Sequence, residues 1–189
     1  KENKYDDNIF FQKYSQMSRS QQGLAGAGEW ETLRKLLPDF KDKRVLDLGC
    51  GYGWHCIYAM EHGASSVVGV DISHKMLEVA KEKTHFPQVE YKCCAIEDVE
   101  FPEESFDVIL SSLAFHYVAD YEILVKKIYR ILKSGGKLVF TVEHPVFTAY
   151  GTQDWHYNEK GEILHFPVDN YYYEGKRTAV FLGEKVTKS

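Results

Sequence analysis

The chain has 189 residues, of which 44% are hydrophobic and 27% are charged. This length and composition suit one folded domain with a real core, but not comfortably two domains, and they exclude a disordered chain. The formal net charge is −5, whereas proteins that neutralise phosphate backbones are usually basic, so no nucleic-acid partner is expected. No stretch approaches the roughly 18 consecutive apolar residues of a membrane-spanning helix, so no membrane span is expected.

The first four residues, Lys1–Lys4, are polar, and no apolar signal-peptide core follows them. The four cysteines stand at positions 50, 56, 93 and 94, and they contain no CxxC pair. This spacing disfavours a zinc site or a disulfide framework and indicates reduced thiols. We therefore expect a cytoplasmic protein without a bound metal.

The predicted elements begin with a helix over residues 5–16, whose apolar residues share one face, and a Gly- and Ser-rich loop over 18–28. A short helix over 29–37 is stopped by Pro38. Short apolar strands then alternate with amphipathic helices. The strands are expected at 44–48, 66–71, 89–93, 106–110 and 137–142, and the helices at 52–61, 75–83 (with Ser73 as N-cap) and 121–132 (ended by Ser134-Gly135-Gly136).

This alternation predicts an α/β fold, a doubly wound, Rossmann-like, mostly parallel sheet with helices on both faces. Right-handed crossovers between parallel strands place those helices. Ligands of such sheets bind beyond the carboxyl ends of the strands. We therefore expect the chemistry of the protein in the loops that follow the strands.

The loop after the first strand reads Asp47-Leu48-Gly49-Cys50-Gly51-Tyr52-Gly53-Trp54. Its G-x-G-x-G spacing lacks the third glycine of the dinucleotide fingerprint. A carboxylate at Asp47 would repel a pyrophosphate but would suit a ligand with an ammonium group. Asp71, at the end of the second strand, is placed to accept both hydroxyls of a ribose. A ribose with a cationic amino group, and no phosphate, describes S-adenosylmethionine.

Four segments together carry a resemblance to a known family: residues 45–53 (VLDLGCGYG), 68–73 (VGVDIS), 101–107 (FPEESFD) and 132–138 (LKSGGKL). From about Tyr14 to Pro145, the chain resembles the class I S-adenosylmethionine-dependent methyltransferases. Within them it is most similar to the small-molecule group of the ubiquinone/menaquinone-biosynthesis methyltransferases. The resemblance implies methyl transfer from S-adenosylmethionine to a small-molecule acceptor by in-line displacement, with release of S-adenosylhomocysteine.

The resemblance also implies roles for residues that follow the strands or lie in the N-terminal segment. At the methionine end it implies Asp47, Gly49, Cys50, Gly51 and Gly53. At the ribose and adenine it implies Asp71, Ile72, Met76, Ala95, Ile96 and Glu97. Near the sulfonium or over the cofactor it implies Ser111, Tyr14 and Arg19, the last as a partner of the cofactor carboxylate. Many relatives carry Asp where this chain has Ala95, which leaves the base contact to backbone near Ile96 or to Glu97.

Two histidines are candidates for a catalytic base, because each follows a strand whose carboxyl end faces the expected site. His116 lies in the loop after the fourth strand, and His144 lies just past the fifth strand. The alternatives are that His116 caps or packs at the next helix and that His144 is a hydrogen-bonded loop residue. The loop Ser111-Ser112-Leu113-Ala114 lacks the Pro-Pro motif of enzymes that methylate DNA amines and the cysteine of enzymes that methylate cytosine. No carboxylate cluster of a Mg-dependent catechol type is present.

The C-terminal part is rich in aromatic residues. Residues 170–173 and 177–182 are predicted to form a β-hairpin around Glu174-Gly175-Lys176. The hairpin is either an aromatic lid over the acceptor or an edge that packs on the sheet or on a second copy. We expect one methyltransferase domain with an N-terminal helical cap (1–40), a cofactor-binding core (41–145) and this lid region (146–189).

The family normally closes its sheet with a further helix and an antiparallel strand pair. The chain stops at Lys185-Val186-Thr187-Lys188-Ser189 without them and starts without Met. We therefore expect a fragment of a longer parent chain, or a partner such as a second copy in a homo-oligomer that covers the open edge. Two further functions stay open: a nucleotide-dependent oxidoreductase, and a non-catalytic S-adenosylmethionine-binding module.

Overall fold

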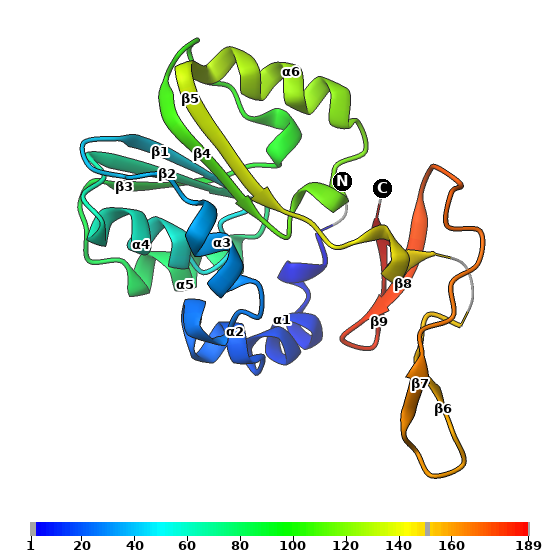
Figure 1. The fold of residues 1–189 in the computed structure, drawn as a ribbon. Coiled ribbons are helices and arrows are strands. Elements are labelled where there is room, and N and C mark those ends of the chain that lie inside the picture. The colour runs from blue at the N-terminus through cyan, green and yellow to red at the C-terminus, as the bar shows by residue number, and fades with distance from the viewer. Residues whose placement is uncertain (1–2, 150–151, 189) are drawn as a thin grey trace.

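The structure is a computed structural model that describes residues 3–149 and 152–188; Lys1, Glu2 and Ser189, discussed above, lie outside these ranges. Its centre is a parallel sheet with the strand order β3-β2-β1-β4-β5 (Figure 1). The strands are β1 (Arg44–Leu48), β2 (Ser66–Asp71), β3 (Val89–Cys93), β4 (Phe106–Ser112) and β5 (Leu132–Thr141). The predicted doubly wound, Rossmann-like fold is confirmed, and β1, β2 and β3 have the predicted bounds.

The helices flank the sheet on both faces and cover its carboxyl end. They are η1 (Lys4–Asp6), α1 (Asn8–Ser15), α2 (Ser18–Gln21), η2 (Gly23–Gly26), α3 (Trp30–Leu36), α4 (Trp54–Glu61), α5 (His74–Lys83), η3 (Ile96–Asp98), η4 (Phe115–Tyr117), α6 (Tyr121–Ile131) and η5 (Pro145–Thr148). Residues 18–28, predicted as a loop, contain the short helices α2 and η2. Each of these helices has four residues and makes about one turn, which is too short for hydrophobic periodicity to detect.

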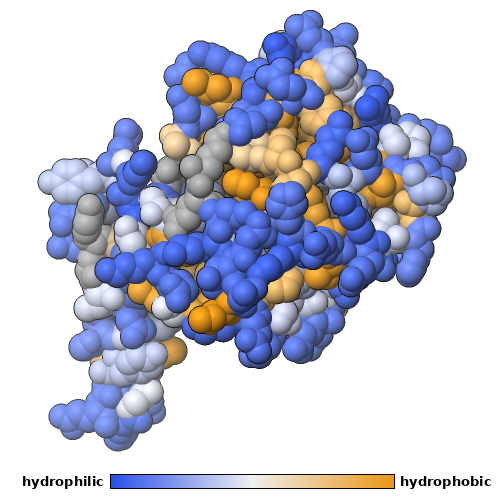
Figure 2. Space-filling model, turned by 180° about the vertical axis from the view of Figure 1, so that it is seen from behind, coloured by the Kyte–Doolittle hydropathy of each residue, from blue (hydrophilic) through white to orange (hydrophobic). Residues whose placement is uncertain are grey.

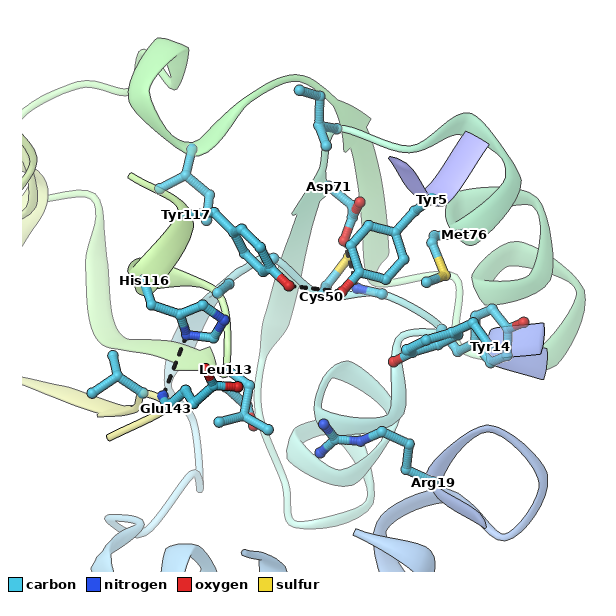
Figure 3. Close-up of a pocket in the computed structure, with 18 of the residues that line it drawn as sticks. Tyr5, Tyr14, Arg19, Cys50, Asp71, Met76, Leu113, His116, Tyr117 and Glu143 are labelled. Carbon is cyan, nitrogen blue, oxygen red and sulfur yellow. Dashed lines mark hydrogen bonds between the residues drawn. The ribbon is translucent and has the colours of Figure 1, made fainter. Parts of the chain in front are cut away.

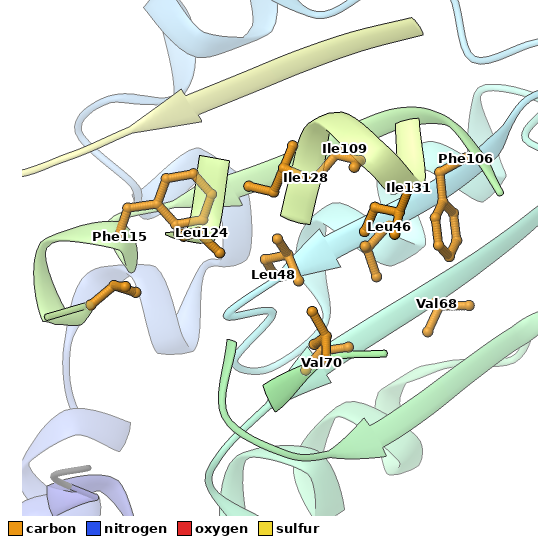
Figure 4. Packing of buried hydrophobic residues seen from close by; sticks show 12 residues of the cluster. Leu46, Leu48, Val68, Val70, Phe106, Ile109, Phe115, Leu124, Ile128 and Ile131 are labelled. Carbon is orange, nitrogen blue, oxygen red and sulfur yellow. The ribbon is translucent and has the colours of Figure 1, made fainter. Parts of the chain in front are cut away.

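Two apolar layers hold the sheet between the helices. On one face, Leu46, Leu48, Val68 and Val70 contact the apolar stripe of α6 (Figure 4). That stripe consists of Leu124, Ile128 and Ile131, which recur at helical spacing. The alternate strand residues Val45 and Val67 point to the other face, where they contact α4 and α5. Burial of each Leu or Ile side chain contributes about 1.5–3 kcal/mol, so the two layers fix the strand ends that carry the site.

The N-terminal segment is anchored at the start of α5. Ser73, the predicted N-cap, accepts the backbone N–H of Met76 at 3.1 Å. Its hydroxyl donates to the Asp6 carboxylate at 2.6 Å, and the same carboxylate accepts the N–H of Lys75 at 3.1 Å. An acidic group at a helix N-terminus is stabilised by the helix dipole. These bonds hold η1 and α1 beside the carboxyl end of β2.

The glycines after α6 lie in a strand and do not cap the helix as predicted. The helix ends at Ile131, and β5 begins at the next residue. Phe106 pairs with Leu132 but Val108 pairs with Lys137, so β5 contains a bulge between these pairs. Gly135, within the bulge, has φ +76°, which a glycine adopts without strain.

The predicted C-terminal hairpin is present, but its predicted pairing and turn are wrong. The strand β8 (Arg177–Phe181) pairs with β9 (Glu184–Lys188), not with residues 170–173. The turn is Leu182-Gly183, whose φ values of +53° and +80° match the two-residue turns that join antiparallel strands. Residues 170–173 are held instead by the guanidinium of Arg177, which donates to the carbonyls of Tyr171 and Tyr173. Among the described residues, this hairpin forms a sheet of its own and adds no strand to the central sheet.

A second hairpin extends from the body as an arm. It consists of β6 (His156–Tyr157) and β7 (Ile163–His165), whose residues are all exposed. Figure 2 shows the arm projecting from a surface that is mostly hydrophilic, with apolar groups interrupted by polar ones. Among the described helices, none is both long and apolar enough to cross a lipid bilayer.

Candidate functional site

A cavity of about 760 Å³ lies where the strands of the central sheet end (Figure 3). Its walls come from the loops after all five strands, from η1, α1 and η2 of the N-terminal segment, and from the hairpin β8–β9. The volume falls within the range of roughly 300–1,000 Å³ that is usual for small-molecule sites. The predicted position of the site, beyond the carboxyl ends of the strands, agrees with this cavity.

The glycine loop after β1 forms one wall of the cavity. Gly49, Gly51 and Gly53 have φ values of +80°, +52° and +74°, a region that other residues rarely adopt. A Cβ on Gly49 would lie 2.4 Å from the Cβ of Ala114, and one on Gly53 would lie 2.2 Å from the hydroxyl of Tyr91. A Cβ on Gly51 would meet no atom within 4 Å. The absence of a side chain at Gly49 and Gly53 therefore lets the loop pack closely against its neighbours. At Gly51 it leaves open space on the cavity side.

Asp71 joins the glycine loop to the end of β2. One carboxylate oxygen accepts the N–H of Gly51 at 2.8 Å, and the other accepts the N–H of Ser73 at 2.9 Å. Burial raises the pKa of Asp71 above its usual range, although these N–H donors oppose the shift. A carboxylate accepts about four hydrogen bonds, so each oxygen of Asp71 keeps acceptor capacity for a ligand.

Three of the predicted site residues lie behind the cavity wall: Asp47, Gly53 and Ser111 are absent from its lining. Asp47 accepts the thiol of Cys56 at 3.5 Å through one oxygen, and its other oxygen has no partner among the described residues. Burial raises the pKa of Asp47 to about 7. The hydroxyl of Ser111 donates to the carbonyl of Leu48 at 2.8 Å, which ties β4 to β1.

The other predicted residues share the cavity. They are Tyr14, Arg19, Gly49, Cys50, Gly51, Asp71, Ile72, Met76, Ala95, Ile96, Glu97, His116 and His144. Arg19 forms an ion pair with Glu29, which also accepts the hydroxyl of Ser112 at 3.1 Å. Burial opposes ionisation of Glu29, but its hydrogen bonds and the charge of Arg19 hold its pKa below the usual range. The guanidinium thus reaches the cavity already paired with a carboxylate.

Tyrosines from the N-terminal segment and from η4 meet over the cavity. The hydroxyls of Tyr5 and Tyr117 are 3.4 Å apart, and the rings of Tyr5 and Tyr14 form an edge-to-face pair at 5.3 Å. Burial raises the pKa of Tyr5 well above its usual range and that of Tyr14 to about 12. Both phenols therefore keep their protons at neutral pH. No sequence pattern indicated Tyr5 and Tyr117 as site residues, because the pair joins residues 112 positions apart.

The two histidines lie at the other end of the cavity, and both use Nδ1 as an acceptor. Nδ1 of His116 accepts the backbone N–H of Glu143 at 3.3 Å, and Nδ1 of His144 accepts that of Val146 at 3.2 Å. Burial, with a smaller contribution from Lys188, lowers the pKa of His116 to about 4. A neutral imidazole that accepts through Nδ1 carries its proton on Nε2. In Figure 3, the second ring nitrogen of His116 is turned toward the middle of the cavity.

An ion pair between Lys188 and Glu143, not predicted from the sequence, lies at the histidine end of the cavity. The ammonium of Lys188 lies 2.6 Å from both carboxylate oxygens of Glu143. Lys188 is 6% exposed, and the rings of Tyr117 and Phe181 lie with their centroids 5.9 Å from its Nζ. The pair connects the end of β5 to β9, which holds the hairpin against the site. No local pattern indicates it, because its residues are 45 positions apart.

Comparison with known proteins assigns the family. The sequence profile described as "Methyltransferase domain" matches residues 46–140. A candidate S-adenosylmethionine-dependent methyltransferase from Listeria monocytogenes has a TM-score of 0.79 and 56% identity, with 85% of this chain and 76% of that chain covered. An S-adenosylmethionine-dependent methyltransferase from Mesorhizobium loti has a TM-score of 0.75 and 41% identity, with 82% and 70% covered.

A curated relative shows the same relationship by sequence. A ubiquinone biosynthesis O-methyltransferase of Coxiella burnetii is 36% identical over 112 residues, which span 58% of this chain and 47% of the relative. The profile match over residues 46–140 includes the glycine loop, Asp71 and the strands that position them. These matches argue against the alternative hypothesis of a nucleotide-dependent oxidoreductase. The chain belongs to the methyltransferase domain family and is an S-adenosylmethionine-dependent methyltransferase.

Proposed function

We propose that the chain methylates a small-molecule acceptor by in-line displacement at the sulfonium of S-adenosylmethionine and releases S-adenosylhomocysteine. The observation that carries this proposal is the cavity itself, which joins Asp71 and the glycine loop to His116 and His144 in one volume. The residues proposed for the cofactor and those proposed for the acceptor thus line the same cavity. The N-terminal tyrosines and the hairpin β8–β9 add to its walls, and its volume supports a small acceptor.

Several features of the chain fit S-adenosylmethionine. The acceptor capacity left on Asp71 suits the two ribose hydroxyls, with Ile72 and Met76 beside the adenine. The buried oxygen of Asp47 that has no partner among the described residues is an acceptor just before the glycine loop, which suits an ammonium group. Gly51 leaves room for a ligand to contact the backbone. When bound, S-adenosylmethionine supplies an activated methyl group on its sulfonium.

The residues of the chain then have to align the acceptor with that methyl group. Good alignment of two reactants is worth about 7–11 kcal/mol of the barrier. His116 and His144 lie at the acceptor end, and their neutral forms offer Nε2–H groups that hydrogen-bond to the acceptor. Because Nδ1 of each ring already accepts a backbone N–H, the free side of each ring donates and does not accept a proton. This arrangement suits positioning of an acceptor whose nucleophilic atom already has a lone pair. The rings of Tyr5 and Tyr14 line the same cavity and limit the access of water to it.

Calorimetric titration tests the cofactor half of the proposal. We expect S-adenosylmethionine and S-adenosylhomocysteine to bind, and NADH not to bind. Asp71→Ala should weaken binding by about 1–3 kcal/mol, because the ribose hydroxyls lose their acceptor. Asp39→Asn, at an exposed carboxylate outside the cavity lining, is the control and should bind as the parent does. Unchanged affinity of Asp71→Ala would contradict the assigned role.

A turnover assay tests the acceptor half. Release of S-adenosylhomocysteine should depend on an added metabolite acceptor from a broad panel. His144→Ala should lower turnover and leave the affinity for S-adenosylhomocysteine unchanged, since His144 lies at the opposite end of the cavity from Asp71. Full activity of this variant would make His144 a loop residue that only caps η5. Cofactor binding without turnover of any acceptor in the panel would favour a non-catalytic binding module.

A further inference from the structure

The ion pair between Lys188 and Glu143 is unusual for its place in the cavity. Both residues belong to the lining, and the Lys188 ammonium is almost completely buried. A buried charge is costly unless a partner compensates it, and here Glu143 is that partner. Glu143 is the more exposed of the two, with 30% of its side chain accessible. The lysine is therefore fixed, whereas the carboxylate borders solvent and has room to turn away.

Two hydrogen-bond donors line the same cavity as this lysine. His116 and His144 in their neutral forms both present Nε2–H, because Nδ1 of each ring already accepts a backbone N–H. His116 also lies close enough to the ion pair for the charges of Lys188 and Glu143 to act on its titration. A ligand that complements one ammonium and two N–H groups brings oxygen atoms with negative charge.

The walls of the same region are apolar. The side chains of Phe147, Phe181 and Val186 line the same cavity as Lys188, and the Phe181 ring lies near its ammonium. Apolar walls around a few convergent polar groups are typical of sites for small organic ligands. The ligand body that fits here is a flat or apolar group, and the charge of Lys188 marks the position of its polar end.

We propose that the methyl acceptor carries an anionic oxygen group, a carboxylate or a phosphate ester, which binds to Lys188 and to the Nε2–H of His116. Without the acceptor, Glu143 occupies Lys188 as an internal substitute for that anion. On binding, the ligand anion takes the place of the Glu143 carboxylate, so the buried ammonium is compensated in both states. This inference rests on the proposed function and specifies the acceptor class of the same cavity.

Two isosteric probes test the proposal on the full chain saturated with S-adenosylhomocysteine. Benzoate and benzamide have nearly the same shape, but benzoate alone is an anion at neutral pH. We expect calorimetry to give a Kd for benzoate at least tenfold below that for benzamide, and phenyl phosphate to bind in the same range as benzoate. Lys188→Met should bring the two Kd values within about twofold. Lys185→Met, at an exposed lysine on the same strand, should preserve the tenfold ratio.

A second variant covers the case in which Lys188→Met does not fold. Glu143→Gln removes the competing charge and keeps the shape of the side chain, so benzoate should bind severalfold more tightly while benzamide is unaffected. Equal Kd values for benzoate and benzamide in the parent protein would overturn the inference, as would weaker benzoate binding by Glu143→Gln. Failure of the parent protein to bind S-adenosylhomocysteine is a different result, which would overturn the proposed function itself.

Discussion

Gly49→Ala and Gly51→Ala form a matched pair that measures how closely the glycine loop approaches the loop after β4. Both glycines have left-handed backbones, with φ values of +80° and +52°. A methyl group on Gly49 would lie 2.4 Å from the Cβ of Ala114, whereas one on Gly51 would have no heavy atom within 4 Å. Both variants therefore carry backbone strain, but the first also carries a steric clash.

The structure gives the expected size of the difference. A left-handed backbone costs a residue with a Cβ about 1–2 kcal/mol. Forcing a methyl group into a packed space costs about 1–3 kcal/mol more. Gly51→Ala should thus lower the free energy of unfolding by about 1–2 kcal/mol, and Gly49→Ala by about 2–5 kcal/mol.

Urea titration followed by tryptophan fluorescence measures both free energies of unfolding. The difference between the two variants isolates the clash with Ala114, because the backbone strain is common to both. Free energies that agree within about 0.5 kcal/mol, the usual range of harmless substitutions, would show that the loop does not lie against Ala114. The close approach that shapes this wall of the cavity would then be refuted.

Three further predictions concern stability. Burial raises the pKa of Asp47 to about 7, so the native state keeps a proton that the unfolded chain releases, and the contribution of Asp47 to stability falls as pH rises from about 4 to 7. The free energy of unfolding of Asp47→Asn relative to the parent should therefore rise across this range in urea titrations, and a constant difference would contradict it. The lowered pKa of His116, about 4, acts in the opposite sense, because the contribution of His116 falls as pH drops from about 6.5 to 4, so His116→Gln should gain stability relative to the parent toward pH 4. Asp120→Ala removes the side chain that accepts the N–H of Ile123 at the start of α6, which should cost about 1 kcal/mol in the same titration at pH 7. If Asp120→Ala lost less free energy of unfolding than an exposed control such as Glu103→Ala, a stabilising role of Asp120 as the N-cap of α6 would be excluded.

The part of the cavity proposed to hold the cofactor was predictable because each of its elements is local in sequence. The strand β1, the glycine loop and α4 follow one another within 18 residues from Arg44 to Glu61, and β2 leads directly into Asp71. Parallel pairing of β1 with β2 then sets the two loops side by side. The register makes Leu48 the partner of Val70, so the strands end together. A pattern that fixes two adjacent strands therefore also fixes the relative position of their loops.

Local patterns were insufficient where side chains replace backbone pairing. The run of tyrosines at 171–173 has strand-forming composition, and its neighbour Glu174-Gly175-Lys176 has turn composition, so a hairpin was expected there. The guanidinium of Arg177 instead binds the carbonyls of Tyr171 and Tyr173, and the chain turns later, at Leu182-Gly183. Composition alone does not distinguish a ladder of backbone bonds from one arginine that supplies several donors.

The part of the cavity proposed to hold the acceptor depends on contacts between distant parts of the chain. His116 bonds to the backbone of a residue 27 positions away, and Lys188 pairs with Glu143 across 45 positions. The hairpin that contributes Lys188 and Phe181 forms its own sheet, so its sequence can change without altering the strands that hold the cofactor half. Acceptor choice should therefore depend on β8–β9 and on the residues that Lys188 contacts. For this reason substitutions at Lys188 and Glu143 are expected to change which ligand binds while cofactor affinity stays constant.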